Sequence, residues 1–105
     1  MVNMTEVIDS VAGAWVKQKL KPPNNYFVMF KNDDYTPMEF VVYLLKKYFN
    51  KNDSAAEKIM IKIHTIGEGV VGLYPFQLAE QKAYNALVET KEQQHPLQIF
   101  LREST

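Results

Sequence analysis

Three side chains that accept hydrogen bonds stand next to one another in the stretch NDDYTPMEF, which begins at residue 32. They are Asn32, Asp33 and Asp34, and two of them are carboxylates. Just after them, Thr36 and Glu39 occupy the polar positions of a capping box, with a proline at the first helical position, so the following helix satisfies its own first amides. The helix does not need Asn32 or Asp33 as caps, so the acceptors of this stretch either stabilise turns in the loop or serve another purpose.

The other residue that could take part in chemistry is His64, which lies at the edge of an apolar helical stripe, where a histidine usually has a structural role. A Ser-His-Asp or two-carboxylate site could be assembled from Asp33, Asp34 and His64 with a serine. Neither a G-x-S-x-G nor an H-E-x-x-H motif accompanies them, so we predict no catalytic residue. His64 and His95 are far apart in the sequence and cysteine is absent, so we also predict no metal site and no cofactor.

The composition limits the kind of protein that can carry these residues. With 105 residues, 47% of them apolar, the chain can form one domain with a single core. Its 12 basic and 12 acidic residues balance, which argues against a nucleic-acid partner because phosphate binding requires a basic surface. No apolar run reaches the roughly 20 residues of a membrane span. No signal-like sequence opens the chain, so we expect a cytoplasmic protein without membrane contact.

The motif KPPNN, residues 21–25, divides the chain in two, because prolines and asparagines end a helix and begin a loop. We predict an N-terminal extension over residues 1–23 and the domain over residues 24–105. The extension carries apolar residues at helical spacing, which makes it a candidate amphipathic helix. We expect this stripe to dock on a neighbouring surface, in this chain or in another copy. Its apolar positions are Met4, Val7, Ile8, Val11 and Trp15.

The domain alternates between strand and helix patterns. Aromatic and β-branched runs predict strands, and apolar residues three and four positions apart predict helices. Ser54 and Glu57 form a second capping box, and Gly67 is the expected end of that helix. The expected elements are a strand at 26–31, a helix after 36 that ends at 50–52, a helix from 54 to 67, a strand at 69–74, a helix from 75, and a strand at 97–101. This order predicts an α+β fold, a small three-stranded, mainly antiparallel sheet with three helices packed on one face.

Four motifs of the domain occur together and in order in a known family. They are NDDYTPMEFV from residue 32, I-H-x-x-G-x-G-V-V-G-L-Y from residue 63, A-E-x-K at 79–82 and HPL at 95–97. From Pro22 to the C-terminus the chain resembles the ClpS family. The resemblance implies a bacterial N-end-rule adaptor, which binds proteins whose free first residue is Leu, Phe, Tyr or Trp and delivers them to the ClpA unfoldase of ClpAP. It also implies a protein that is not itself an enzyme.

The resemblance implies a ligand for the hydrogen-bond acceptors of the loop. A free α-amine is an ammonium group with three donors, so its site must present acceptors, ideally with a carboxylate among them. By resemblance, Asn32 and His64 contact the amine and Asp33 holds it directly or through water, with His64 neutral so that it can accept. Asp34 is expected to be a loop carboxylate near the positive end of the following helix.

The first side chain of the ligand would enter an apolar pocket. Met38 and Val41 are three residues apart on one predicted helix, and Met60 and Ile63 on the next, so each pair can face a shared cleft. Without the resemblance, ordinary core packing would be the preferred interpretation. By resemblance, the pocket is formed by Met38, Val41, Met60, Ile63 and Leu97.

The surface that would face the unfoldase departs from the family pattern. Gln77 stands where family members carry an acidic residue, and Pro75 where a capping threonine is common. Glu80 and Lys82 match the A-E-x-K motif. The resemblance therefore implies an interface with a ClpA-type AAA+ unfoldase at Gln77, Glu80 and Lys82, with one expected ion pair missing.

Two other function classes remain compatible with these residues. A general protein-interaction module of the same small α+β shape would need no amine site. A hydrolase would use His64 with Asp33. A peptide beginning with Phe and its N-acetylated twin separate the classes, because only amine recognition depends on a free N-terminus.

Overall fold

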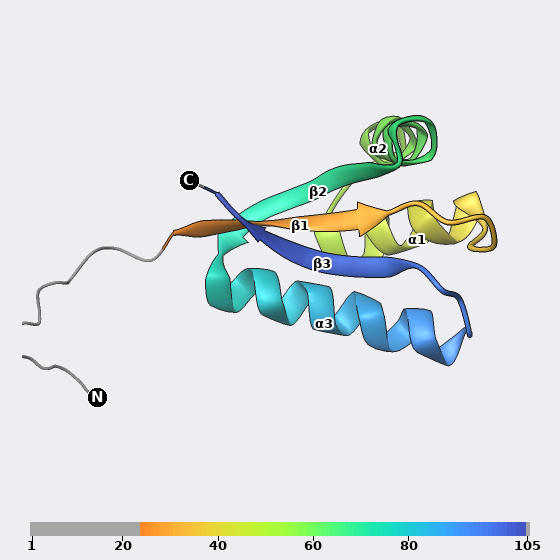
Figure 1. The fold of residues 1–105 in the computed structure, drawn as a ribbon. Helices are drawn as coiled ribbons and strands as arrows, with labels where there is room; N and C mark the ends of the chain where they lie inside the picture. Colours follow the sequence, from red (N-terminus) through yellow and green to blue (C-terminus); the bar gives the residue numbers. More distant parts are fainter. Residues whose placement is uncertain (1–23, 105) are drawn as a thin grey trace, which may run out of the picture.

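The strand β1, Asn25–Lys31, forms the centre of the molecule and delivers the chain into the Asn-Asp-Asp loop (Figure 1). The structure is a computed structural model that describes residues 24–104, so the N-terminal extension and its apolar stripe lie outside the described residues. The remaining elements are α1 (Met38–Phe49), α2 (Asp53–Ile66), β2 (Glu68–Pro75), α3 (Phe76–Glu92) and β3 (Gln98–Glu103).

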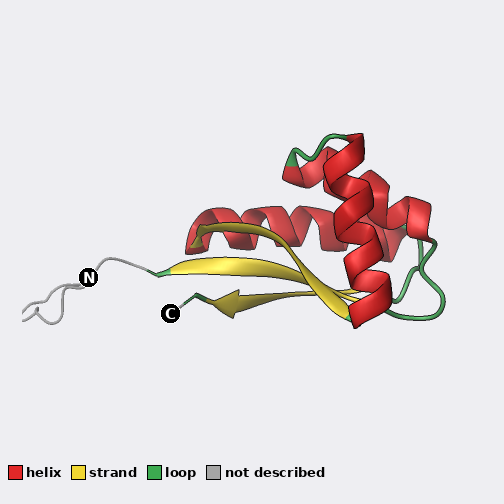
Figure 2. Cartoon of the chain, turned by 90° about the horizontal axis from the view of Figure 1, so that it is seen from above, coloured by secondary structure: helices red, strands yellow, loops and turns green. Residues whose placement is uncertain are grey.

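The sheet has the strand order β2-β1-β3, and both pairings are antiparallel. Lys31 at the end of β1 lies opposite Glu68 of β2 and Gln98 of β3. The register between β1 and β2 shifts between Val28 and Met29, where β2 carries one extra residue. Viewed from above, the helices lie to one side of the sheet, with α2 beside the start of β2 (Figure 2). The predicted fold class is confirmed, and the sheet is antiparallel throughout.

The core lies between the sheet and the helices. Alternate residues of a strand point to opposite faces, so Val28 and Phe30 share the face that meets the helices, and both are fully buried. The ring of Phe30 packs edge-on against Phe49 of α1, with 5.7 Å between the ring centroids. The other buried members of this cluster are Val41, Leu44, Leu45, Ala56, Ile63, Val71, Ala79, Ala86 and Leu97.

The start of α1 differs from the prediction. The capping box of Thr36 and Glu39 is wrong, because Pro37 is the N-cap residue and no side chain caps the helix. The hydroxyl of Thr36 donates instead to the carboxylate of Asp33 in the preceding loop, at 2.8 Å. A capping threonine accepts an amide hydrogen on its side-chain oxygen, whereas here the hydroxyl donates to a carboxylate in a charge-assisted bond. The side chain of Thr36 is therefore held in the loop rather than over the first turn of α1.

The start of α2 also differs, whereas its end agrees with the prediction. Asn52 is the N-cap, and its side chain accepts from the amide of Ala55 at 2.8 Å, so the capping box predicted at Ser54 is wrong. Asparagine is among the best N-cap residues and comes first along the chain. Gly67 ends the helix as predicted, with φ of 109° and its N–H donating to the carbonyl of Ile63.

Candidate functional site

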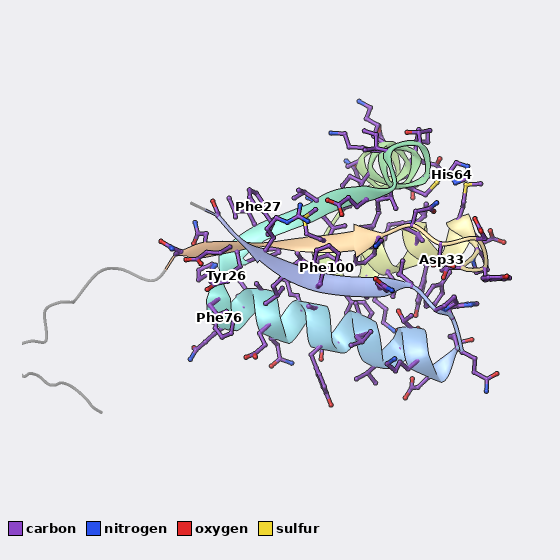
Figure 3. The ribbon with its side chains drawn as sticks, in the orientation of Figure 1. Tyr26, Phe27, Asp33, His64, Phe76 and Phe100 are labelled. Atoms are coloured by element: carbon purple, nitrogen blue, oxygen red, sulfur yellow. The ribbon has the colours of Figure 1, made fainter. Side chains whose placement is uncertain are left out.

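A hollow of about 310 Å³ lies where the loop after β1 meets α1, α2 and the residue before β3. It brings together all eight residues that the sequence analysis assigned to the amine and the first side chain of a ligand. Figure 3 shows Asp33 and His64, which both line it, at the same end of the molecule. The eight are Asn32, Asp33, Met38, Val41, Met60, Ile63, His64 and Leu97.

The floor of the hollow is apolar and closed to water. Val41, Ile63 and Leu97 are 6%, 2% and 4% exposed, because α1, α2 and the end of the α3–β3 connection converge there on the core. Met60 is partly buried beside them. Met38 is 47% exposed, so it stands at the rim rather than in the floor. An apolar group that enters the hollow would leave water and contact these side chains.

The polar end is organised by the left-handed turn at Gly67. Its carbonyl accepts from the amide of Asn32 at 2.8 Å, which ties the loop after β1 to the end of α2. His64 lies in the last turn of the same helix and is exposed. One backbone hydrogen bond therefore holds Asn32 at the helix end that carries His64.

Asp33 already has three partners within its own loop. Its carboxylate accepts from the amides of Tyr35 and Thr36 and from the hydroxyl of Thr36, each at 2.8 Å. Partial burial raises the pKa of Asp33, but the hydrogen bonds from Thr36 and Tyr35, together with the nearby His95, outweigh it and hold the pKa below its ordinary value. Asp33 is thus a stable anion that shapes the loop.

Asp34 is the neighbouring carboxylate, and its side chain is exposed at the same hollow. Within residues 24–104 no hydrogen bond engages it, which leaves both of its oxygens available to a ligand. The sequence alone predicts a loop carboxylate at Asp34 and does not predict this difference from Asp33. The spacing of Asp33 and Thr36 is a signal that could have found it, because Asp commonly bonds to backbone amides two or three residues ahead. Tyr35, Thr36 and Pro37 also line the hollow.

The residues assigned to an unfoldase interface all lie on α3. Gln77 and Glu80 are exposed and one turn apart, and the first turn of the helix contains no acidic residue. Lys82 is partly buried, since its Nζ donates to the carbonyl of Tyr48 at 3.1 Å and lies 5.4 Å from the ring centre of Tyr74. Lys82 therefore satisfies one of the free carbonyls in the last turn of α1.

Neither a metal site nor a membrane span is found in the described part of the chain. Over residues 24–104, no three His, Asp or Glu side chains gather closely enough to hold a metal ion. The helices in this range are too short or too polar to cross a membrane.

The chain forms a small α+β domain, and the pocket described above has a polar end and an apolar floor. This combination is typical of a ligand-binding module. The model of the family described as "ATP-dependent Clp protease adaptor protein ClpS" matches residues 21–100. The chain belongs to this family, as the resemblance in its motifs predicts.

Curated relatives with this description cover most of the chain. The adapter protein ClpS of Herminiimonas arsenicoxydans is 46% identical over 87 residues, 83% of this chain and 85% of the relative. ClpS of Shewanella pealeana is 41% identical over 103 residues, 98% of this chain and all of the relative. Among solved structures, Agrobacterium tumefaciens ClpS2 bound to L-phenylalaninamide superposes with a TM-score of 0.76 at 36% identity, covering 78% of this chain and 99% of that one.

Proposed function

We propose that this Clp adaptor binds proteins through a free N-terminal α-amine and a bulky first side chain, Leu, Phe, Tyr or Trp. The observation that carries the proposal is the joining of a buried apolar floor and polar side chains, Asp34 and His64 among them, in a single hollow. The related ClpS2 was solved with L-phenylalaninamide, a molecule that has a free α-amine beside one aromatic side chain. Both halves of such a ligand have a counterpart in this pocket.

The amine would be held by acceptors of different kinds. Asn32 and His64 contact it through neutral oxygen and nitrogen atoms, which requires His64 to be unprotonated. Asp34 offers a carboxylate that makes no hydrogen bond within residues 24–104, and Asp33 contributes its negative charge directly or through water while it orders the loop. An ammonium group with three donors is satisfied by this set, whereas an acetylated N-terminus has lost the charge and two of the donors.

The first side chain would fill the apolar floor. Burying one large apolar side chain contributes about 1.5 to 3 kcal/mol. Hydrogen bonds to a charged group contribute about 1.5 to 3 kcal/mol each. Against the loss of translational and rotational freedom, so small a contact gives affinity in about the micromolar range. Release of the bound protein during delivery is compatible with an affinity of this order.

Delivery needs a second surface away from the pocket. We propose that α3 provides it, with Gln77, Glu80 and Lys82 facing the N-terminal domain of a ClpA-type AAA+ unfoldase in the cytoplasm. Gln77 lacks the charge that would strengthen this contact, so we expect Gln77→Glu to tighten it. The adaptor itself breaks no bond, and the protease performs the hydrolysis.

The test uses three fluorescent peptides that are identical beyond their first residue. One begins with Phe, one with N-acetylated Phe and one with Arg, and binding to the full chain is followed by anisotropy. We expect the free Phe peptide alone to bind. Equal binding of the acetylated peptide would refute amine recognition and favour a general interaction module, and peptide cleavage would refute the adaptor.

A further inference from the structure

We propose that Gly69 sets the depth of the pocket, although Gly69 does not line it. The inference rests on the proposed function, because pocket depth is read out through the size of the first residue of the ligand. Gly69 acts on the pocket through Ile63, which forms part of the floor. Gly69 is therefore a positioning residue for specificity.

The contact between these two residues is unusually close. Gly69 is a buried residue of β2 and lies opposite Phe30, so its missing side chain would point to the core face of the sheet. A methyl group at its Cα would lie 2.8 Å from Cγ1 of Ile63, 3.7 Å from the backbone nitrogen of Ile63 and 3.8 Å from its Cδ1. Carbon atoms in favourable contact are about 3.5 to 4.0 Å apart. The three nearest atoms all belong to Ile63, so its side chain is the first that must move to admit the methyl group.

Space rather than backbone conformation explains the glycine at this position. Among the described glycines, positive φ occurs at Gly67. Gly69 has no such requirement, and its backbone could carry an alanine. What excludes the alanine is Ile63, which occupies the place of the methyl group.

The packing around Ile63 leaves its side chain one direction in which to move. Ile63 lies within α2, where a β-branched side chain has one strongly preferred χ1 rotamer, so it cannot rotate freely. Its surroundings in the core are close-packed, and it is only 2% exposed. The empty volume that it borders is the pocket of about 310 Å³, whereas the neighbouring hollow beside Met29 and Val70 does not include Ile63 among its residues. A methyl group at position 69 therefore displaces Ile63 toward the ligand.

We expect this displacement to weaken the binding of ligands whose first residue is largest. In Gly69→Ala, we expect the affinity for a Trp-starting peptide to fall at least about tenfold, because overpacking a filled site by one methyl group is costly. The affinity for a Leu-starting peptide should change by less than about threefold, since Leu leaves more of the floor unfilled. Ile63→Val keeps the Cγ1 carbon that meets the added methyl group but lacks Cδ1, the atom that would be pressed into the pocket, so it should restore part of the Trp binding.

The experiment combines peptide binding with a double-mutant cycle. Wild type, Gly69→Ala, Ile63→Val and the double variant are titrated with peptides beginning with Leu, Phe and Trp, and each protein is unfolded in urea. Gly72→Ala is the matched control: Gly72 also lies in β2, but its added methyl group would meet the ring of Tyr74, and Tyr74 does not line the pocket. We expect Gly72→Ala to lower stability through this contact and to leave the peptide ranking unchanged.

Three results overturn the inference. They are an equal loss for Leu and Trp peptides in Gly69→Ala, the same ranking change in Gly72→Ala, and no recovery of Trp binding in the double variant. Failure of the proposed function is distinguishable, because wild type would then bind free and acetylated Phe peptides alike. In that case urea unfolding decides the packing claim by itself, since an unchanged free energy of unfolding in Gly69→Ala would overturn it.

Discussion

Replacing Asp33 by alanine should destabilise the folded domain as well as weaken ligand binding. The change removes the acceptor of three hydrogen bonds, from the amides of Tyr35 and Thr36 and from the hydroxyl of Thr36. Each such bond contributes about 0.5 to 1.5 kcal/mol, and more when one partner is charged. Since the loop is partly exposed, we expect a total loss of about 2 to 3 kcal/mol in the free energy of unfolding.

The pKa of Asp33 determines how the stability difference between wild type and Asp33→Ala depends on pH. The pKa of Asp33 is lower in the folded protein than its ordinary value of 3.8, so the folded state holds its carboxylate in the ionised form. Its contribution to stability is complete above that ordinary value and is lost as the pH falls through the lower, folded pKa. The stability difference between wild type and Asp33→Ala should therefore shrink only in acid, below about pH 4.

Urea unfolding at pH 7 and pH 3 measures both effects, and peptide anisotropy measures binding. Asp34→Ala is the control, because Asp34 is exposed and makes no hydrogen bond within the described residues. It should leave stability within about 0.5 kcal/mol of wild type while it weakens binding of a Phe-starting peptide. Asp33→Asn should keep most of the stability, since an amide oxygen still accepts from the loop amides. Equal stability of Asp33→Ala and wild type would show that the three bonds do not hold the loop.

Other substitutions test the remaining parts of the molecule. Met38→Ala should admit Ile- and Val-starting peptides, whose β-branches would otherwise meet the rim. It should weaken binding of Leu and Phe peptides by about 1 kcal/mol, because the side chain of Met38 is only partly buried. An unchanged ranking of the four peptides would show that Met38 is a packing residue. Hydrogen bonds from Tyr43 and Tyr48 lower the pKa of Glu89 from 4.5 to about 2, so Glu89→Gln should lower the unfolding midpoint at pH 7, and the difference should disappear as the pH falls from about 4.5 toward 2. A difference that persists at pH 2 would contradict this assignment. Lys82→Glu should stop ClpAP from degrading a Leu-starting substrate without loss of peptide binding. Normal degradation would exclude α3 as the unfoldase interface. Urea unfolding measures the stability lost with the bond from Lys82 to the carbonyl of Tyr48.

The elements of this fold could be predicted to within a few residues, because each depends on a local pattern. The strand predicted at 26–31 is observed at Asn25–Lys31, and the helix end at Gly67 follows from the freedom of glycine to adopt positive φ. The starts of α1 and α2 were less predictable. Several capping residues stand close together there, and the competition between Asn52 and Ser54 depends on small differences in geometry.

The sequence by itself predicted the fold class from apolar periodicity and capping signals. Its ordered motifs, through their resemblance to the family, predicted the eight residues that line the pocket. Tertiary structure decided how their atoms are used. The carboxylate of Asp33 is engaged by its own loop and that of Asp34 is not, although the two residues are adjacent and chemically alike. Lys82 bonds to a carbonyl of α1, and Gly69 meets Ile63, only because the chain brings those elements together. Such contacts depend on the direction of individual bonds in the packed domain, which no linear pattern of residue types specifies.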